Sequence, residues 1–308
     1  MNIVITGALG HIGSGLIRKI SQVKNLKKVY LIDNASSNNL NVLFKLNCKK
    51  IKFKFIHDDL INRGILKSIN DKIDIVIHLA SITNAEQSFN IKKKIYRNNY
   101  GIFKNIIDFC KKKNANLVHI SSTSVYGVQS NLVDENCRNL RPQSPYADLK
   151  LLEEKKLKNL GKKINFITFR FGTITGISKG MRFHTAVNKF CFNTVMKKEI
   201  PIWNNALDQY SPYLSLEDAI NTIIFVINKN LFDRQIYNVL TNNYTVRNIL
   251  NLIKKHNFKM KIKNTNSPIL NQNSYLVSRD KIESLGIKLK KNIDKDIKNT
   301  LSLLKNFY

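Results

Sequence analysis

Short apolar runs alternate with longer amphipathic segments along the first half of the chain. Segments between the runs, such as 13–23 and 98–113, have helical length. This alternation predicts a parallel sheet covered by helices on both faces, and right-handed crossovers make it a doubly wound α/β fold. Six runs have the length and composition of buried strands: residues 3–5, 29–32, 53–56, 75–77, 117–120 and 166–169.

The pattern becomes less regular after about residue 175. We expect residues 1–175 to form the doubly wound domain and residues 176–308 to form mainly a smaller C-terminal α/β lobe, with some segments returning to the first domain. Thr245 has the residue type of a helix N-cap. The segments predicted in this half are helices at 185–198, 216–228 and 245–256, and strands at 200–203 and 236–239.

A glycine-rich segment joins the first predicted strand to the first predicted helix. Glycines allow a tight turn and a close approach of the backbone to a pyrophosphate, which the free N–H groups of the helix N-terminus then bind. The segment therefore predicts a dinucleotide-binding loop of the Rossmann type. Its candidate cofactor contacts are Gly7, Gly10, His11, Ile12 and Gly13.

Asp33 ends the second predicted strand, twenty residues after Gly13. A carboxylate at this place accepts hydrogen bonds from the adenosine ribose and repels a 2′-phosphate, so the sequence favours NAD over NADP. The alternative interpretation of Asp33 is a turn residue in front of Asn34.

The spacing Thr-Gly-x-x-Gly-x-x-Gly resembles the extended short-chain dehydrogenase/reductase family, which includes UDP-galactose 4-epimerase and nucleotide-sugar dehydratases. Further matches follow in the family's order and cover most of the chain: Asp59-Leu60, His78-Leu79-Ala80-Ser81, Asn98-x-x-Gly101, the hydroxyl-rich segment from Ser121 to Gly127, and Tyr146-x-x-x-Lys150. The resemblance implies NAD as cofactor. It adds Asn34, Asp59, Leu60, Leu79, Ala80, Ser81, Asn98, Tyr146 and Lys150 to its contacts.

The resemblance also implies that Ser122, Tyr146 and Lys150 are catalytic. Oxidation of a sugar alcohol needs a base, and a tyrosine with a reference pKa near 10 is a poor one; lowering it to about 7 takes roughly 4 kcal/mol. A lysine ammonium supplies part of this by favouring the phenolate. Four residues apart on a helix, Tyr146 and Lys150 share one face. In the family this lysine also holds the nicotinamide ribose, and the Ser122 hydroxyl bonds the reacting sugar oxygen.

Departures from the family pattern concern the substrate. Family dehydratases carry acidic residues where this chain has Thr123 and Ser124, so 4,6-dehydration is disfavoured. Ser211 stands in place of an arginine that often binds the substrate diphosphate, and Arg182, Arg234 or Arg279 is expected to substitute. His184 is interpreted as a packed or loop histidine. The expected substrate contacts are Thr123, Ser124, Thr173, Arg182, Asn188, Trp203 and Arg279.

The leading functional hypothesis is 4-epimerisation of a nucleotide-activated sugar through a 4-keto intermediate. A one-way nucleotide-sugar dehydrogenase or ketosugar reductase uses the same residues and stays open. A non-catalytic dinucleotide sensor or nucleic-acid-binding protein is the alternative from another class, and the net charge of +30 suits it. Because the lysines are spread along the chain and are not interleaved with aromatic residues, we favour solvated basic surfaces over a nucleic-acid site.

Three further expectations concern the environment of the protein. Scattered cysteines and the absence of both a secretory signal and a long apolar run indicate a cytoplasmic protein that does not span a membrane. The histidines and cysteines lack metal-ligand spacing, so no metal site is expected. In the family, the helix after Asn98 and the helix of Tyr146 often pair in a dimer, and we expect a homodimer because the first helix has a broad apolar surface: Ile102, Phe103, Ile106, Ile107 and Phe109.

Overall fold

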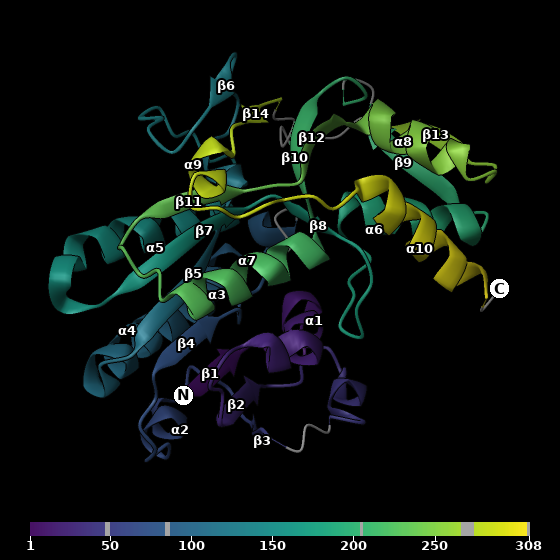
Figure 1. Cartoon of the computed structure of the whole chain (residues 1–308). Helices are drawn as coiled ribbons and strands as arrows, with labels where there is room; N and C mark the ends of the chain where they lie inside the picture. Colours follow the sequence, from purple (N-terminus) through teal and green to yellow (C-terminus); the bar gives the residue numbers. More distant parts are fainter. Residues whose placement is uncertain (47–49, 84–86, 204–205, 266–273, 307–308) are drawn as a thin grey trace.

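A seven-stranded parallel sheet forms the centre of the protein (Figure 1). The computed structural model describes residues 1–46, 50–83, 87–203, 206–265 and 274–306. The strands lie in the order β11-β7-β5-β4-β1-β2-β3, and all paired neighbours are parallel. They are β1 (Asn2–Thr6), β2 (Lys28–Asp33), β3 (Lys52–His57), β4 (Ile75–His78), β5 (Asn116–Ser122), β7 (Phe166–Phe171) and β11 (Ile236–Val239).

The six strands expected in the first half of the sequence are therefore confirmed, as is the doubly wound fold. Central strands are buried on both faces, so their residues are apolar without alternation; every residue of β4 and of β7 is buried. The edge strand β3 alternates instead, with Lys52 exposed beside the half-buried Phe53.

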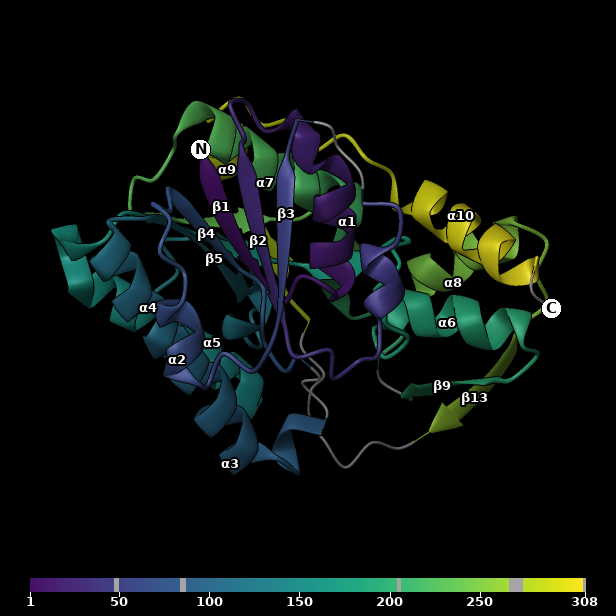
Figure 2. The same ribbon diagram turned by 90° about the horizontal axis from the view of Figure 1, so that it is seen from below.

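Helices cover both faces of this sheet (Figure 2). One face carries α1 (His11–Lys19) and α7 (Leu216–Lys229), whose apolar side chains share a core with β1 and β2. The opposite face carries α2 (Arg63–Lys67), α4 (Gly101–Lys113) and α5 (Pro145–Leu160), with a second core. Shorter helices complete this part: 3₁₀ turns Ile20–Gln22, Leu40–Leu43, Gln87–Phe89, Thr123–Val125 and Gly161–Lys163, and α3 (Lys92–Ile95), which continues through the π-helical turn Tyr96–Tyr100 into α4.

The second half of the chain builds a smaller lobe with its own core. The helices and the two strands expected in this half form, and Thr245 caps α8 by accepting a hydrogen bond from the Asn248 amide. Two of its segments, α7 and β11, belong to the central sheet and its covering layer. The remaining elements are β8 (Thr173–Thr175), α6 (Ala186–Val195), β9 (Glu199–Trp203), β10 (Tyr210–Ser215), β12 (Asn242–Thr245), α8 (Val246–Lys255), β13 (Lys261–Thr265), α9 (Asp280–Glu283), α10 (Ile293–Lys305), and the short pair β6 (Leu132–Val133) with β14 (Leu276–Val277).

The apolar residues on which the expectation of a dimer was based lie inside the subunit. Ile102, Phe103, Ile106, Ile107 and Phe109 of α4 are each at most 5% exposed, because α4 packs them against the sheet and its neighbouring helices. That reason for a dimer was wrong. The solvent side of α4 carries charged side chains instead: Lys104, Asp108, Lys111 and Lys112.

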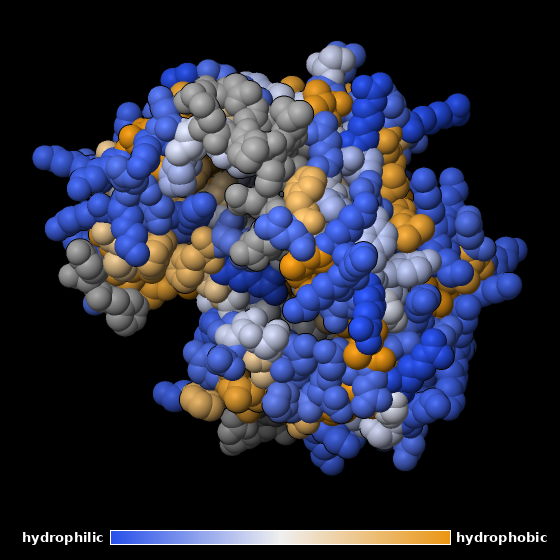
Figure 3. All heavy atoms as spheres, turned by 180° about the vertical axis from the view of Figure 1, so that it is seen from behind, coloured by the Kyte–Doolittle hydropathy of each residue, from blue (hydrophilic) through white to orange (hydrophobic). Residues whose placement is uncertain are grey.

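Exposed apolar side chains do not gather into one large patch on the face shown in Figure 3, where they form small separate groups on a mostly hydrophilic surface. Within the described part of the chain, no helix combines the length and hydrophobicity needed to cross a bilayer.

Candidate active site

A cavity of about 400 Å³ opens at the carboxyl ends of β1, β4 and β5. The carboxyl edge of a doubly wound sheet is where ligands bind, and this volume lies within the usual range for small-molecule sites. Its lining joins segments far apart in sequence, from the glycine loop to Tyr275. The sequence-predicted residues in the lining are Gly7, Gly10, His11, Ile12, Gly13, Leu79, Ser81, Ser122, Thr123, Ser124, Tyr146, Lys150, Thr173 and Arg182.

The glycine loop is shaped to admit a phosphate group. Gly7 has a φ of +66°, and a Cβ there would lie 2.6 Å from the Ala80 nitrogen. A Cβ at Gly13 would lie 2.4 Å from the Gly7 oxygen. Gly10 caps α1 without any side-chain hydrogen bond, so the first amides of this helix are left for a ligand. These residues fit the pyrophosphate of a dinucleotide.

Three polar side chains from the ends of β2 and β3 extend the site beyond the cavity. Asp33 accepts hydrogen bonds from the backbone amides of Leu9 at 2.9 Å and Ala35 at 2.8 Å. Asn34 donates to Asp59 at 3.2 Å. The carboxylate of Asp33 therefore ties the glycine loop to the strand end at which ribose recognition is expected. Leu60, the neighbour of Asp59, is buried in the core under α2 and α4.

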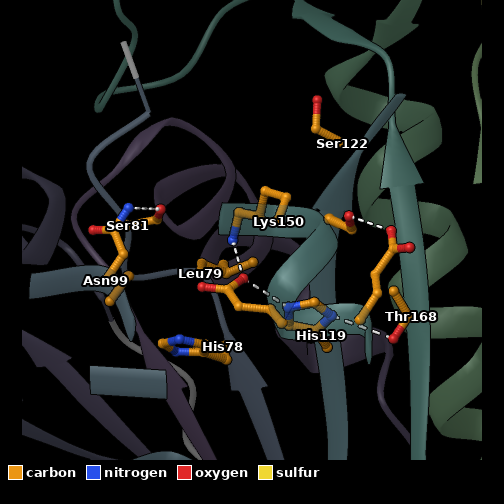
Figure 4. A network of polar contacts seen from close by, with 12 residues as sticks. His78, Leu79, Ser81, Asn99, His119, Ser122, Lys150 and Thr168 are labelled. Carbon is orange, nitrogen blue, oxygen red and sulfur yellow. Dashed lines mark hydrogen bonds and ion pairs between the residues drawn. The ribbon is translucent and has the colours of Figure 1, made fainter. Parts of the chain in front are cut away.

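The asparagine that reaches the loop after β4 is Asn99 and not Asn98. Asn99 is 1% exposed, accepts a hydrogen bond from the Ile82 amide at 2.9 Å and donates to Ser81 Oγ at 2.9 Å (Figure 4). Asn98 is half-buried, does not line the cavity, and donates at 3.3 Å to the Asn99 side chain. Both lie in the π-helical turn, which changes the angle between successive side chains and so alters which one faces the sheet.

Tyr146 and Lys150 lie together on the first turns of α5. The Ser144 hydroxyl accepts a hydrogen bond from the Ala147 amide and Pro145 begins the helix, which fixes the start that both residues need. The Lys150 nitrogen lies 5.9 Å from the centre of the Tyr146 ring. Burial raises the pKa of Tyr146, while the charges of Lys150 and Arg182 act to lower it.

Ser122 ends β5 at the cavity. Its hydroxyl accepts hydrogen bonds from the Ser124 hydroxyl at 2.9 Å and the Ser124 amide at 3.2 Å. The Ser122 proton is therefore left to donate to a ligand. Thr123 is 2% exposed, with its hydroxyl 3.5 Å from that of Tyr275. This end of the cavity is rich in hydroxyl groups, and no described lining residue is an Asp or Glu.

An ion pair lies beneath Lys150. The Lys150 ammonium is 2.8 Å from Oε2 of Glu153, and Nε2 of His119 lies 3.0 Å from the same oxygen (Figure 4). The other ring nitrogen of His119 is 3.3 Å from the Thr168 hydroxyl. Figure 4 shows Ser122 directed away from this network. Sequence reasoning missed Glu153, although a residue three positions after Lys150 on a helix shares its face.

Arg182 crosses the opening between the glycine loop and Tyr146. Its guanidinium bonds the Thr83 hydroxyl and lies 3.4 Å from where a Gly10 Cβ would be. Burial lowers the pKa of Arg182, and the charges of Tyr146 and Asp33 act in the opposite direction. Arg182 therefore borders both the glycine loop and the part of the cavity that Tyr146 lines. His184 also lines the cavity, from the loop before α6, and burial lowers its pKa.

Four other residues that were expected near the substrate are not brought into the described cavity lining. Asn188 is fully buried and donates to the Arg182 carbonyl at 3.0 Å, so it supports the loop that carries Arg182. Trp203 ends β9, where it pairs with Thr265. Arg279 bonds the carbonyl of Thr241 and pairs with Glu283. Arg234 donates to Asn165 at an exposed site, so neither arginine replaces the one missing at Ser211.

Several residues in the lining were not expected from the sequence: Thr83, Ile120, Phe171 and Tyr275. Only the return of a distant segment brings Tyr275 to the cavity. No group of three or more His, Cys, Asp and Glu side chains placed to hold a metal ion occurs among residues 1–46, 50–83, 87–203, 206–265 and 274–306.

A glycine loop and a Tyr–Lys pair around one cavity of a doubly wound sheet define a dinucleotide-dependent enzyme of the short-chain dehydrogenase/reductase type. The sequence profile of the NAD dependent epimerase/dehydratase family matches residues 3–239, and the chain belongs to this family. The resemblance to the extended branch of these enzymes is thereby confirmed, and NAD is the cofactor of the family.

Similar proteins have varied activities. A dTDP-D-glucose 4,6-dehydratase of Dictyostelium discoideum is 27% identical over 78% of this chain, and an ADP-L-glycero-D-manno-heptose-6-epimerase of Brachyspira hyodysenteriae is 26% identical over 71%. The matches span 58% and 70% of those proteins. The solved structure of UDP-glucuronic acid 4-epimerase from Bacillus cereus, with UDP-glucuronic acid and NAD, covers 100% of both chains with a TM-score of 0.89 at 22% identity.

Proposed function

We propose that this protein uses NAD to epimerise a nucleotide-activated sugar at C4 through a 4-keto intermediate. The observation that carries the proposal is the composition of the catalytic end of the cavity. Tyr146, Lys150 and Ser122 line it, whereas Thr123 and Ser124 stand where a dehydratase needs a carboxyl group. The aliphatic hydroxyls of Thr123 and Ser124 are poor general acids near neutral pH, and no Asp or Glu occurs among the described lining residues, so 4,6-dehydration is disfavoured.

Each catalytic residue has one task in this mechanism. Tyr146 takes the proton of the C4 hydroxyl and later returns it. Ser122 donates a hydrogen bond to the same sugar oxygen, and Lys150 favours the phenolate of Tyr146. NAD, when bound, supplies the hydride acceptor at C4. The epimer would form if the hydride returned to the opposite face of the 4-keto sugar, and the cofactor would then be unchanged overall.

Product analysis tests this function. The protein, with NAD, is incubated with a panel of UDP-, dTDP- and ADP-sugars, and the products are identified by NMR. We expect one sugar to reach an equilibrium mixture of its two C4 epimers without net NADH formation. A 4-keto-6-deoxy product would contradict the assignment. Stoichiometric formation of NADH would instead indicate the one-way dehydrogenase, and consumption of NADH in a parallel incubation supplied with NADH would indicate the reductase.

Assembly and location are separate proposals. We keep the homodimer and the cytoplasmic location as expectations from the resemblance and the sequence. Cys110, Cys137 and Cys191 are free thiols, which suits a reducing compartment. Cys48 lies outside the described residues. In this proposal the positive surface charge attracts the diphosphate of the substrate and not a nucleic acid.

A further inference from the structure

Two adjacent glutamates of α5 are buried next to the catalytic pair. Glu153 is 1% exposed and Glu154 is 4% exposed. Glu154 forms an ion pair with Arg170, whose Nη2 lies 2.7 Å from Oε2 and whose Nε lies 3.0 Å from Oε1. Glu154 also accepts a hydrogen bond from the Ser121 hydroxyl at 2.5 Å. Glu153 is matched by the catalytic Lys150 itself. Burial of an unpaired charge is very unfavourable, so these two ion pairs are what allows both carboxylates inside the protein.

The partners of Glu153 define its charge. Burial would raise the pKa of Glu153, but Lys150 and His119 together lower it to about 2, so it is ionised. Burial lowers the pKa of His119, so this ring is neutral. Because a carboxylate can only accept hydrogen bonds, neutral His119 donates from Nε2 to Glu153, and its Nδ1 accepts from Thr168. The buried group of Lys150, Glu153 and His119 therefore has no net charge.

We propose that Glu153 is a positioning residue for the Tyr146–Lys150 pair: its carboxylate holds the Lys150 ammonium in place and, by compensating the charge, sets the pH at which the pair gives up its first proton. The inference rests on the function proposed above for this pair. It does not make Glu153 a catalytic residue, because no contact of Glu153 with the cavity is seen: Lys150 lines the cavity and Glu153 does not.

Other charged and titratable groups also act on the pair. They come from α5 itself, from β4 and β5, and from the segment before α6. The groups are Glu154, His78, His119 and Arg182. Loss of the Glu153 charge removes an interaction that raises the pKa of His78 and of His119, so both rings stay neutral in the variant. Whichever member of the pair loses its proton first, removal of the nearby negative charge makes that loss easier, so the direction of the effect is fixed even though the two groups titrate together.

The first measurement is the pH dependence of kcat/KM for three variants with NAD bound. Glu153→Gln keeps an oxygen that accepts from both Lys150 and His119 but removes the charge. We expect its acid limb to move to lower pH by about one unit. Glu153→Asp keeps the charge, so the acid limb should stay at the native pH. Its turnover should fall, because the shorter side chain reaches Lys150 less well. Glu154→Gln removes a neighbouring buried charge that contacts Arg170, and should move the limb less than Glu153→Gln.

The second measurement needs no sugar substrate. The affinities of NAD and NADH are measured at about pH 6, well below the reference pKa of lysine. The oxidised nicotinamide ring is positive and the reduced ring is neutral. Loss of the Glu153 charge should therefore weaken NAD relative to NADH by about threefold or more, the effect of one nearby charge. Circular dichroism and thermal melting verify that each variant is folded.

The outcomes separate this inference from the proposed function. An acid limb that shifts in Glu153→Gln but not in Glu153→Asp, together with the changed NAD/NADH ratio, supports it. If the acid limb of the pH profile and the NAD/NADH affinity ratio are both unchanged in folded Glu153→Gln, the inference is overturned and Glu153 is a packing residue. The function proposed above is tested separately by Tyr146→Phe. A limb that moves equally in Glu153→Asp and Glu153→Gln also overturns the inference, because the contact and not the charge would then be responsible.

Discussion

The backbone amide of Leu9 donates a 2.9 Å hydrogen bond to the carboxylate of Asp33. Leu9 belongs to the glycine loop, and Asp33 ends the neighbouring strand β2, so one side chain joins the two places where we expect a dinucleotide to be recognised. The residue expected to choose between NAD and NADP therefore also holds the loop expected to bind the pyrophosphate. A substitution of Asp33 should for this reason affect both cofactors, but not equally.

We predict that the native protein binds NAD at least about tenfold more tightly than NADP, because one repulsive charge at close range contributes at least about 1.4 kcal/mol. In Asp33→Ser the preference should narrow, while NAD itself binds less tightly because the Leu9 amide loses its partner. Titrations with both cofactors measure this. Equal affinities in the native protein would mean that Asp33 does not face the 2′ position.

Replacement of Tyr146, the proposed catalytic base, should separate cofactor binding from turnover. Tyr146→Phe removes one oxygen from the cavity and leaves the glycine loop, Asp33 and Lys150 in place. NAD affinity should stay near native, whereas turnover should fall by about a hundredfold or more, as expected for a lost general acid–base group. Near-native turnover of a sugar that the native protein converts would show that the proton leaves by another route.

Replacement of Lys150 has a structural consequence that its ion pair with Glu153 predicts. Lys150→Met leaves a buried carboxylate without its cation, and should lower the free energy of unfolding by about 3–5 kcal/mol. NAD binding and turnover should both fall. The double variant Lys150→Met/Glu153→Gln should recover most of the stability but none of the turnover. Denaturant unfolding of the three proteins measures this, and a double variant no more stable than the single one would contradict it.

Stability should fall in mild acid because of buried neutral histidines. Burial lowers the pKa of His11 from 6.5 to about 4, and its Nε2 is 3.0 Å from the Gly176 carbonyl. Between these pH values the unfolded chain binds a proton that the folded protein excludes. The stabilising contribution is thus complete above pH 6.5 and is lost as the pH falls toward 4, reaching a loss of about 2 kcal/mol at pH 5.

His11→Gln removes this titration. Between pH 7 and pH 5 the melting temperature of the native protein falls. The fall in His11→Gln should be smaller by about 4 °C for a chain of this size. His57→Gln, at an exposed position, is the control and should follow the native protein. His78, whose pKa burial lowers to about 3, continues to act in both variants. Parallel pH dependences of native protein and His11→Gln would contradict the prediction.

Salt should control any dimer formed through α4. A symmetric contact between two copies would bring together the exposed Lys104, Lys111 and Lys112 of both. Their repulsion is screened at high ionic strength, so the dimer should be favoured by about 0.5 M salt relative to 0.05 M. Light scattering at micromolar concentration measures the mass. A monomer at both salt concentrations would exclude the homodimer under these conditions.

The strand–helix alternation was sufficient to predict the sheet. The glycine spacing and the order of the motifs were sufficient to predict that the glycine loop, Ser122, Tyr146 and Lys150 lie at one site. These features depend on local rules: the period of apolar residues, the conformational freedom of Gly7, and the four-residue separation of Tyr146 and Lys150 on one helix. They are visible along the sequence because the residues that cooperate are close in it.

The tertiary structure alone decided which distant residues meet at the site. His119 joins Glu153 across 34 residues, and Arg182 reaches Thr83 across 99. The π-helical turn directs Asn99 rather than Asn98 toward the loop after β4, and packing against the sheet buries the apolar side of α4 that the sequence left open to a partner. Residue types and spacing carry no record of such contacts, because the contacts depend on how whole elements pack and on which buried charge lies next to which.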